Sequence, residues 1–580
     1  MNTKFHPARR LASLLLLAAS IPAARGGDVP DLAALDTAIA NNDPAIRITG
    51  DITLPASRTI NASLDFKPPF KLFKGATSLD LIINGAMPNR PEHFFGKKAG
   101  TFEWEPGDIR GMMGKTSTTP GSDRLAEWWG ALSSAGLIFH SNPAIQLQLR
   151  QADDDTRAIN CAVGAVPVNS AAATPTEPYT VQLGSGLYYI SCPVILTNTK
   201  CTLRGRSSFN TGLIAFTNPD VPAEWQWLAH TSGFTWMKRL NPGDGNTAFQ
   251  NTSNHVAMIY VGGTVFQTPA PPLPLYPAHF QKKRNPDPAA ALTKVYDIGF
   301  GPMKEFPDDP TQTNCPAYYW PDPSFTPGNA AMSHVSCLHG PDAVSSLVGP
   351  GTLLQNINGG NYTAYGVGFC ESTVVDGFTF HGFHMNNMGA KSTAPGHGIF
   401  LPSQTSNCTI EKGTIGAGYH MFWPGAPDDP CNPNDRGLLD MIAIVAQGTN
   451  VKISNIHIEH CHVGVDIISS LQGSPPTDVF VTNVDYNVDT SAPSYQNYSP
   501  HAALVRIRGR GREDEAPNDL QVNATIRNTA IAKPHLSFPH LSEPGSSFSV
   551  VPSLLQNQPA FPTMAYYKRG SNADPRSPLF

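Results

Sequence analysis

The sequence predicts an all-β protein whose main part is a right-handed parallel β-helix, a solenoid of stacked coils, and two observations support this fold. The first is a recurring strand with a corner in its middle. In "VKISNIHI" (451–458), apolar residues alternate on each side of Asn455. The second is that the loops between strands vary from a few to about twenty residues while the strands stay constant, as in a solenoid. A β-sandwich, the alternative, predicts hairpin turns of fixed short length.

The long strand recurs at 373–380, 408–415, 479–486 and 524–531, and a shorter strand precedes each copy, at 366–369, 398–401, 441–444, 464–467 and 504–507. We expect one position of the long strand to stack from coil to coil, at Val375, Ile410, Ile453, Val481 and Ile526.

The corner residue of each coil forms a second predicted column. It is Asn455, Asn483 and Asn528 in the later copies, with Gly377 and Lys412 in the earlier ones. An asparagine at a tight corner can hydrogen-bond to backbone N–H and C=O groups that the corner leaves without a partner. Stacked asparagines can also hydrogen-bond to one another along the axis of the coils.

The first 26 residues are typical of a secretory signal peptide. Lys4, Arg9 and Arg10 precede an apolar stretch from Leu11, which ends in small residues. The adjacent arginines leave a twin-arginine signal open. No later segment is long and apolar enough to span a membrane. We therefore expect a secreted or periplasmic protein.

The rest of the chain divides into three predicted parts. Residues 27–124 are strand-like with little helical pattern, which indicates a small β domain or an additional cap. Residues 125–535 form the β-helix domain, with a proline-rich and aromatic insertion at about 216–350. Residues 536–580 form a tail. In "DDDTRAIN" with "CAV" (153–163), after the acidic residues, we expect an N-terminal capping helix whose buried face carries Ala158, Ile159, Ala162 and Val163.

Charge and cysteine content limit the partners. The net charge is −5 over the 580 residues. The leader removes four cations and no acids, so the mature chain carries about −9, which argues against nucleic acid as a partner. Nine cysteines permit disulfides in an exported chain. Cys192 and Cys201 are close enough in sequence to pair, or cysteines here are small buried fillers.

The motifs "EWWGA", "DDTRAIN", "VQLGSGLYYIS" and "TLRG" resemble the opening of the pectate-lyase-like superfamily, in which a capping helix precedes the first coil. The resemblance covers roughly 125–215 and 360–535, and it implies the fold rather than an activity.

Four coils are also distantly similar to glycoside hydrolase family 28, the polygalacturonase group, at "PGHGIF", "LLDMIAI", "CHVGVDI" and "LVRIRGRG". That family carries Asn-Thr-Asp, Asp-Asp, Gly-His-Gly and Arg-Ile-Lys on successive coils. Asp440 matches one aspartate of the pair, and "RIR" resembles the basic motif. His397 stands where the first motif has its aspartate, Leu439 replaces an acid, and His462 lies only near the Gly-His-Gly position.

The candidate catalytic residues follow from an outward column on the shorter strands. We expect this column to contain Gly368, Phe400, Ala443, Asp466 and Arg506, with Arg508 one step on; the candidates are Asp440, Asp466, Arg506, Arg508, His397 and His462.

Two chemistries fit these residues. Hydrolysis with inversion needs an acid and a base about 6.5–9.5 Å apart, and Asp440 and Asp466 are the best pair. Elimination needs a base and a cation for the substrate carboxylate, which Arg506 and Arg508 supply. We expect no cofactor for a hydrolase, whereas Ca²⁺ is compatible with a lyase. The alternative without a catalytic role is that Asp466 and Arg506 form a surface ion pair.

The candidate substrate-binding residues are His457, Glu459, Asp485 and Trp423. His457 and Glu459 point outward from one coil, and Asp485 and Asn487 occupy the same columns on the next. His381 lies two coils earlier in the Glu459 column. The histidines therefore belong to separate positions, and we predict no metal site.

These residues predict a secreted carbohydrate-active enzyme that cleaves an acidic extracellular polysaccharide, with hydrolysis favoured over elimination. The alternative is a non-catalytic glycan-binding or surface-structural protein. Both a monomer and a homotrimer are compatible with the sequence.

Overall fold

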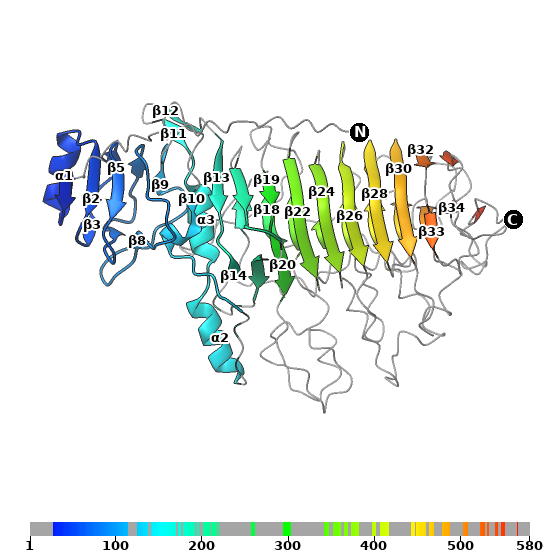
Figure 1. Cartoon of the computed structure of the whole chain (residues 1–580), viewed down its shortest axis with the longest axis horizontal. Coiled ribbons are helices and arrows are strands. Elements are labelled where there is room, and N and C mark those ends of the chain that lie inside the picture. Colours follow the sequence, from blue (N-terminus) through cyan, green and yellow to red (C-terminus); the bar gives the residue numbers. More distant parts are fainter. Residues whose placement is uncertain are drawn as a thin grey trace, which may run out of the picture.

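Parallel sheets dominate the computed structural model of the chain (Figure 1), which describes residues 27–113, most of 124–220 and, from 257 to 566, mainly the strands. The described part is mostly β and contains few helices. These are α1 (Leu32–Ala40), the 3₁₀-helix η1 (Ala126–Trp129), α2 (Pro143–Ala152) and α3 (Thr156–Gly164).

Two long sheets form most of the described structure. The 15-stranded sheet follows the order β10 (Arg124–Leu125), β13 (Tyr179–Gln182), β16 (Cys201–Arg204), β19 (Lys294–Tyr296), β22 (Thr352–Gly360), β24 (Thr373–His381), β26 (Thr409–Gly416), β28 (Val451–Glu459), β30 (Val479–Asn487), β32 (Asn523–Arg527) and β35 (Ser547–Val550), and it also contains β14 (Gly186–Ile190), β17 (Thr211–Ala215), β20 (Gly299–Pro302) and β33 (Ala530–Ala532). The 10-stranded sheet follows the order β15 (Val194–Leu196), β18 (Ala257–Val261), β21 (Asp342–Ser346), β23 (Tyr365–Gly368), β25 (His397–Leu401), β27 (Ile442–Ala446), β29 (Val463–Ile468), β31 (Ala503–Arg508), β34 (His540–Ser542) and β36 (Ala565–Tyr566).

From β22 to β32 the chain alternates between the two sheets, and each strand pairs in parallel with the next strand of its own sheet. The chain therefore winds in stacked coils. The predicted column is confirmed at every step, because the register pairs Val375 with Ile410, Ile410 with Ile453, Ile453 with Val481 and Val481 with Ile526.

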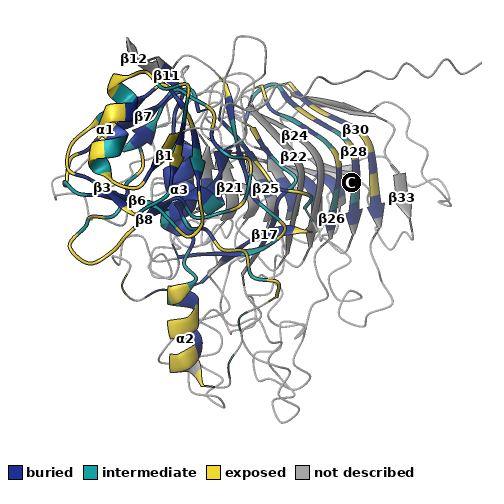
Figure 2. Ribbon diagram, turned by 60° about the vertical axis from the view of Figure 1, so that its left-hand side comes forward, coloured by how far each residue is buried: buried dark blue, intermediate teal, exposed yellow. Residues whose placement is uncertain are grey.

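Side chains alternate across this sheet as the period of a strand requires. Ile453, Ile456 and Ile458 of β28 are buried, while Lys452 is exposed and His457 is half-buried. Figure 2 shows the same striping of buried and exposed residues along β28 and β30.

The predicted asparagine column is also confirmed where it is described. Lys412, Asn455 and Asn483 all have positive φ angles of 57°, 56° and 53°. The Nδ2 group of Asn483 donates to Oδ1 of Asn455 at 3.1 Å. Asparagine tolerates this left-handed conformation and links one coil to the next. Asn528 lies outside the described residues.

A second ladder, which the sequence analysis missed, runs just before the long strands. Asn407, Asn450 and Asp478 have φ angles of 57°, 53° and 57°. Nδ2 of Asn450 donates to Oδ1 of Asn407 at 2.8 Å. Asp478 follows Asn450 on the next coil, because Val451 pairs with Val479. The ladder lacks a donor at Asp478, since an ionised carboxylate only accepts.

Asp478→Asn is therefore expected to stabilise the protein by about 0.5–1 kcal/mol, because the new amide can donate to Asn450 and asparagine suits the left-handed backbone. Chemical denaturation monitored by circular dichroism measures the change. Asp478→Ala is the control, and it should destabilise by roughly 1 kcal/mol because alanine is strained at this φ. An asparagine variant no more stable than the alanine variant would contradict the ladder.

The N-terminal region also consists of stacked parallel strands. Three small sheets have the orders β1 (Gly27–Val29), β2 (Ala45–Ile48), β5 (Ser63–Phe66); β3 (Ile52–Leu54), β6 (Leu72–Lys74), β8 (Phe95–Gly96); and β4 (Arg58–Ile60), β7 (Leu81–Ile83), β9 (Ile109–Arg110). A short antiparallel hairpin, β11 (Val168–Asn169) and β12 (Ala172–Pro175), follows later in the chain. The chain passes through the three small sheets in turn, so the region makes coils of its own.

These N-terminal coils share one hydrophobic core with the long sheets. A single cluster of buried residues extends from Val29 to Val505. The region is therefore continuous with the two long sheets in its packing.

Helix α1 corrects the expectation of little helix in this region. Its N-cap Asp31 accepts a hydrogen bond from the backbone N–H of Ala34 at 2.9 Å, and Leu35 and Ala38 are buried. Figure 1 shows α1 at one end of the elongated molecule, where it contacts β1 and β3. It covers the apolar end of the first coil.

The helix predicted within 153–163 is confirmed as α3, with Ala158, Ile159, Ala162 and Val163 all buried. Its position differs from the expected N-terminal cap. The helix contacts β9 and η1 on the side of the N-terminal coils and β15 of the 10-stranded sheet. Because coils lie on both sides of α3, this helix packs inside the stack of coils. Helix α1 is the one that covers the N-terminal end of the stack.

The acids before α3 hold neighbouring loops as well as the helix start. Asp154 accepts from the backbone N–H of Thr156 at 3.0 Å and from the hydroxyl of Ser191. Asp155 accepts from the backbone N–H groups of Leu132 at 2.8 Å and Tyr189 at 3.1 Å. Burial raises the pKa of Asp154, and it raises that of Asp155 well above its usual range.

These raised pKa values predict that stability falls as pH rises. In the folded state Asp154 and Asp155 keep their protons to higher pH than in the unfolded chain, where an aspartate titrates near about 3.9. Their contribution is complete below that pH and is lost as pH rises through the folded pKa values. Asp155→Asn should flatten this slope, measured from denaturant midpoints across the mildly acidic to neutral range. Asp28→Asn, at an exposed position of β1, should leave the slope unchanged. Equal slopes in all three proteins would contradict the assignment.

Strands also lie inside the ranges expected for the insertion and the tail. β18, β19, β20 and β21 fall within 216–350, and β34, β35 and β36 fall within 536–580. All of them belong to the two long sheets. The coils therefore continue through both ranges, and the expected insertion is confined to the segments between these strands.

The described residues bear on two further expectations. None of their helices combines the length and hydropathy of a membrane span. Cys201 is a free, buried thiol whose pKa is raised by burial to about 12, so it does not form the disulfide considered with Cys192. Cys192 and residues 1–26, the expected signal peptide, lie outside the described part.

Candidate functional site

Asp466 and Arg506 lie side by side on the 10-stranded sheet. Asp466 is in β29 and Arg506 in β31, and the register pairs them directly; Ile468 pairs with Arg508 one step on. Neighbouring strands are about 4.8 Å apart. The structure therefore brings together three of the predicted catalytic positions that are up to 42 residues apart in sequence.

The column through Asp466 needs one correction. Gly368 pairs with Phe400 as predicted, but Phe400 pairs with Val445 rather than Ala443, and Val445 pairs with Asp466. Ala443 is fully buried. The sequence "MIAIVA" is apolar at every position, so its period could not fix the register.

His397 does not lie beside Asp466. It begins β25 and its column continues through Ile442, Val463 and Ala503. That places it two strands and three residues away from Asp466. Asp440, His462 and Trp423 lie outside the described residues, so the separation of the proposed acid and base stays a prediction.

The predicted binding residues lie on the other long sheet. His457 of β28 pairs with Asp485 of β30, and Glu459 pairs with Asn487. His381 pairs with Gly416, which pairs with Glu459, so the predicted columns are confirmed. The candidate residues therefore form two groups, one on each long sheet.

The described side chains of the second group face outward. His457 is half-buried between the buried Ile456 and Ile458, and Asp485 is exposed between the buried Val484 and Tyr486. An imidazole and a carboxylate on adjacent coils can hydrogen-bond to sugar hydroxyls.

Two more outward columns accompany them on β26, β28 and β30, and we call this surface the coil face. One column contains Thr409, Lys452 and Phe480, and the other contains Glu411, Ser454 and Thr482. The alternation along the strands that turns His457 outward also turns these residues outward.

No group of three or more histidine, cysteine, aspartate or glutamate residues in the described part is arranged to hold a metal ion. A calcium requirement stays a prediction tied to the lyase chemistry.

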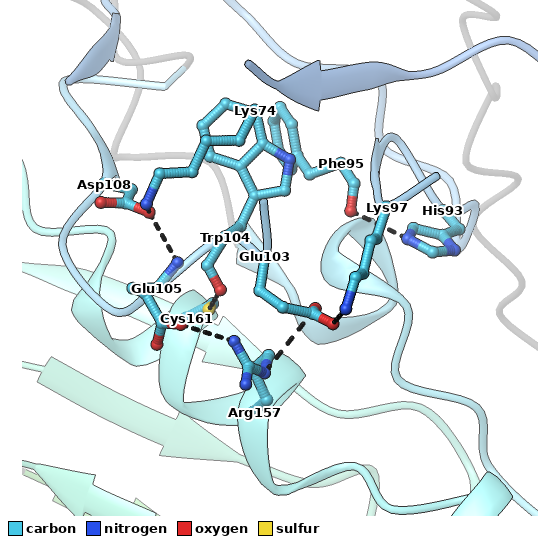
Figure 3. A network of polar contacts seen from close by, with 10 residues as sticks. All are labelled: Lys74, His93, Phe95, Lys97, Glu103, Trp104, Glu105, Asp108, Arg157 and Cys161. Carbon is cyan, nitrogen blue, oxygen red and sulfur yellow. Dashed lines mark hydrogen bonds and ion pairs between the residues drawn. The ribbon is translucent and has the colours of Figure 1, made fainter. Parts of the chain in front are cut away.

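A dense polar network lies at the junction between the N-terminal coils and α3 (Figure 3). Lys74 pairs with Asp108 at 2.5 Å, and Arg157 of α3 pairs with Glu105 at 2.6 Å. Burial raises the pKa of Glu105, and the nearby Arg157 reduces that rise without cancelling it. Only 3% of the Lys74 side chain is exposed. A substrate cannot reach this lysine, so the network fastens the junction rather than forming a catalytic site.

No protein-family description and no curated protein matches this chain. Among solved structures, the surface protein and adhesin PfbA of Streptococcus pneumoniae matches with a TM-score of 0.37 at 11% identity, covering 77% of this chain and 98% of the adhesin. A family 28 exopolygalacturonase of Yersinia enterocolitica matches with a TM-score of 0.36 at 11% identity, covering 79% of this chain and 80% of the enzyme. An alginate lyase from a Paenibacillus species matches with a TM-score of 0.23 at 7% identity, covering 91% of this chain and 98% of the lyase. At such low TM-scores the likeness carries no argument about fold or activity.

Proposed function

We propose that this chain is a secreted carbohydrate-active enzyme, exported by its leader, that cleaves an acidic extracellular polysaccharide on a right-handed parallel β-helix. The observation that supports this most is the direct register of Asp466 with Arg506 on adjacent strands. A carboxylate can transfer a proton, and a guanidinium one coil away can bind a substrate carboxylate through two hydrogen bonds.

Hydrolysis is the favoured reaction. Asp466 would act with Asp440, one as the acid that protonates the leaving oxygen and the other as the base that activates water. Arg506 and Arg508 would hold the acidic sugar in place. The sequence supplies two aspartates, Asp440 and Asp466, for the acid and base roles and the "RIR" motif for binding an acidic sugar.

Elimination is the second chemical solution. One arginine in its neutral form would then remove the proton beside a uronate carboxyl group while its neighbour, or a Ca²⁺ ion, neutralises that group. A C=C bond forms as the bond to the glycosidic oxygen breaks, and that oxygen leaves with a proton from solvent or from the protonated base. The products distinguish the two reactions, because elimination leaves an unsaturated sugar.

The test is a panel of uronate-containing and neutral polysaccharides incubated with the purified protein. New reducing ends without ultraviolet absorbance of unsaturated sugars indicate hydrolysis, and both signals together indicate elimination. A repeat with a chelator shows whether a metal is needed.

A non-catalytic glycan-binding protein is the second candidate, and the regular polar columns of the coil face favour it. Retention of a polysaccharide without either cleavage signal would replace the enzyme proposal with this one.

A further inference from the structure

Phe480 is an exposed aromatic residue at one corner of the coil face, on β30. Its neighbours in β30, Val479 and Val481, are fully buried, while 38% of Phe480 is exposed. The ring therefore points away from the core on a strand that pairs on both sides, with β28 and β32. An apolar ring held on a sheet is a flat platform at low entropic cost.

A lysine lies beside this platform. Lys452 of β28 is the direct register partner of Phe480 and is exposed. It forms no ion pair within the described part of the chain. Glu411 on the previous coil pairs instead with Lys412 at 3.6 Å. The positive charge of Lys452 therefore remains available to a ligand.

The surroundings complete a polar site. Ser454 and Thr482, which are register partners, place half-buried hydroxyl side chains in the next outward column. The charge that opposes an anionic ligand is Asp478, which is exposed two residues before Phe480.

We propose that Lys452, Phe480, Ser454 and Thr482 form a second glycan-binding site, separate from the sheet that carries Asp466. A sugar ring stacks on Phe480, its carboxylate contacts the ammonium group of Lys452 one coil away, and its hydroxyls bond to Ser454 and Thr482. The ligand is an acidic polysaccharide, because Lys452 carries the charge among these four residues and lies directly beside the ring in register. This choice of ligand class rests on the proposed function.

Binding of the full chain to polygalacturonate and to a neutral glucan, measured by affinity electrophoresis, tests the site. Phe480→Ala should weaken binding to the acidic polymer about tenfold, which corresponds to the loss of one stacked ring. Lys452→Ala should weaken it several-fold, and added salt should weaken wild-type binding. Asp478→Asn should bind at least as tightly as the wild type. Phe102→Ala is the matched control, because Phe102 is an exposed aromatic residue of the N-terminal region, and it should have little effect on binding.

Wild-type affinity in Phe480→Ala, or equal affinity of the wild type for neutral and acidic polymers, would overturn the proposal. So would a drop in molar mass of Phe480→Ala in light scattering, since the ring would then pack against a second copy of the chain. Unchanged thermal midpoints in the variants assign any loss of binding to the site. If no polymer is cleaved yet binding still depends on Phe480, the enzyme proposal fails and this site stands.

Discussion

Replacing Asp466 by asparagine is expected to lower kcat/KM for polysaccharide cleavage at least a hundredfold and to leave the thermal midpoint nearly unchanged. Asparagine keeps the size of the side chain but cannot exchange a proton, and general acid–base catalysis contributes about 10²–10⁴-fold. Reducing-end release from the best polymer of the panel measures the effect. Because Asp466 lies in register with Arg506, its loss removes the carboxylate of the proposed site without touching the buried column.

Asp28→Asn provides the matched control, since Asp28 is an exposed aspartate on β1 at the other end of the structure. It should retain the full rate. Arg506→Ala should mainly raise KM if the guanidinium binds substrate and mainly lower kcat if it acts as the base of an elimination. Full activity of Asp466→Asn would show that the site lies on a different face.

The stacked coils were predictable because their strands are long. Eight or nine residues with a corner in the middle contain enough alternation to fix both the inward face and the coil-to-coil register, as Ile453 and Val481 show. The strands of the N-terminal coils have two to four residues, which is too few for a period to appear. Those coils and the long sheets share one hydrophobic core. This packing depends on residues far apart in sequence, so no local sequence pattern predicts it.

The candidate site was predictable only in part, because a register can be predicted only where apolar and polar residues alternate regularly along the strand. Asp466 and Arg506 came together because each lies in a strand whose apolar residues are regular. The register slipped by two residues at Ala443, where every neighbour is apolar. A signal for Phe480 was present, since it is an aromatic residue at an outward position of "VFVTNVDY". The second ladder carried a weaker signal, because Asn407, Asn450 and Asp478 precede strands in the way that ordinary turn residues do.

Trp128→Ala is expected to destabilise the protein by about 3–5 kcal/mol, a large share of the roughly 5–15 kcal/mol that holds a folded domain. Trp128 is fully buried in η1. Its ring lies 6.3 Å from Phe94 and 6.1 Å from Trp129, and Phe94 stacks on Phe66 at 4.4 Å. Its indole N–H donates to the carbonyl of Arg90 at 3.2 Å. The substitution leaves a cavity between the N-terminal coils and the segment that carries α3.

The damage should be local, because each coil of a solenoid is stabilised mainly by its neighbours. Hydrogen exchange read by mass spectrometry should show lost protection in β5, β8 and η1, while β28 and β30 keep theirs. Phe102→Ala, at a position that is 42% exposed, is the control and should change stability by less than about 0.5 kcal/mol. A Trp128 variant as stable as this control would mean that the aromatic cluster does not join the two sets of coils. Loss of protection across the whole chain would instead mean that the junction governs the folding of every coil beyond it.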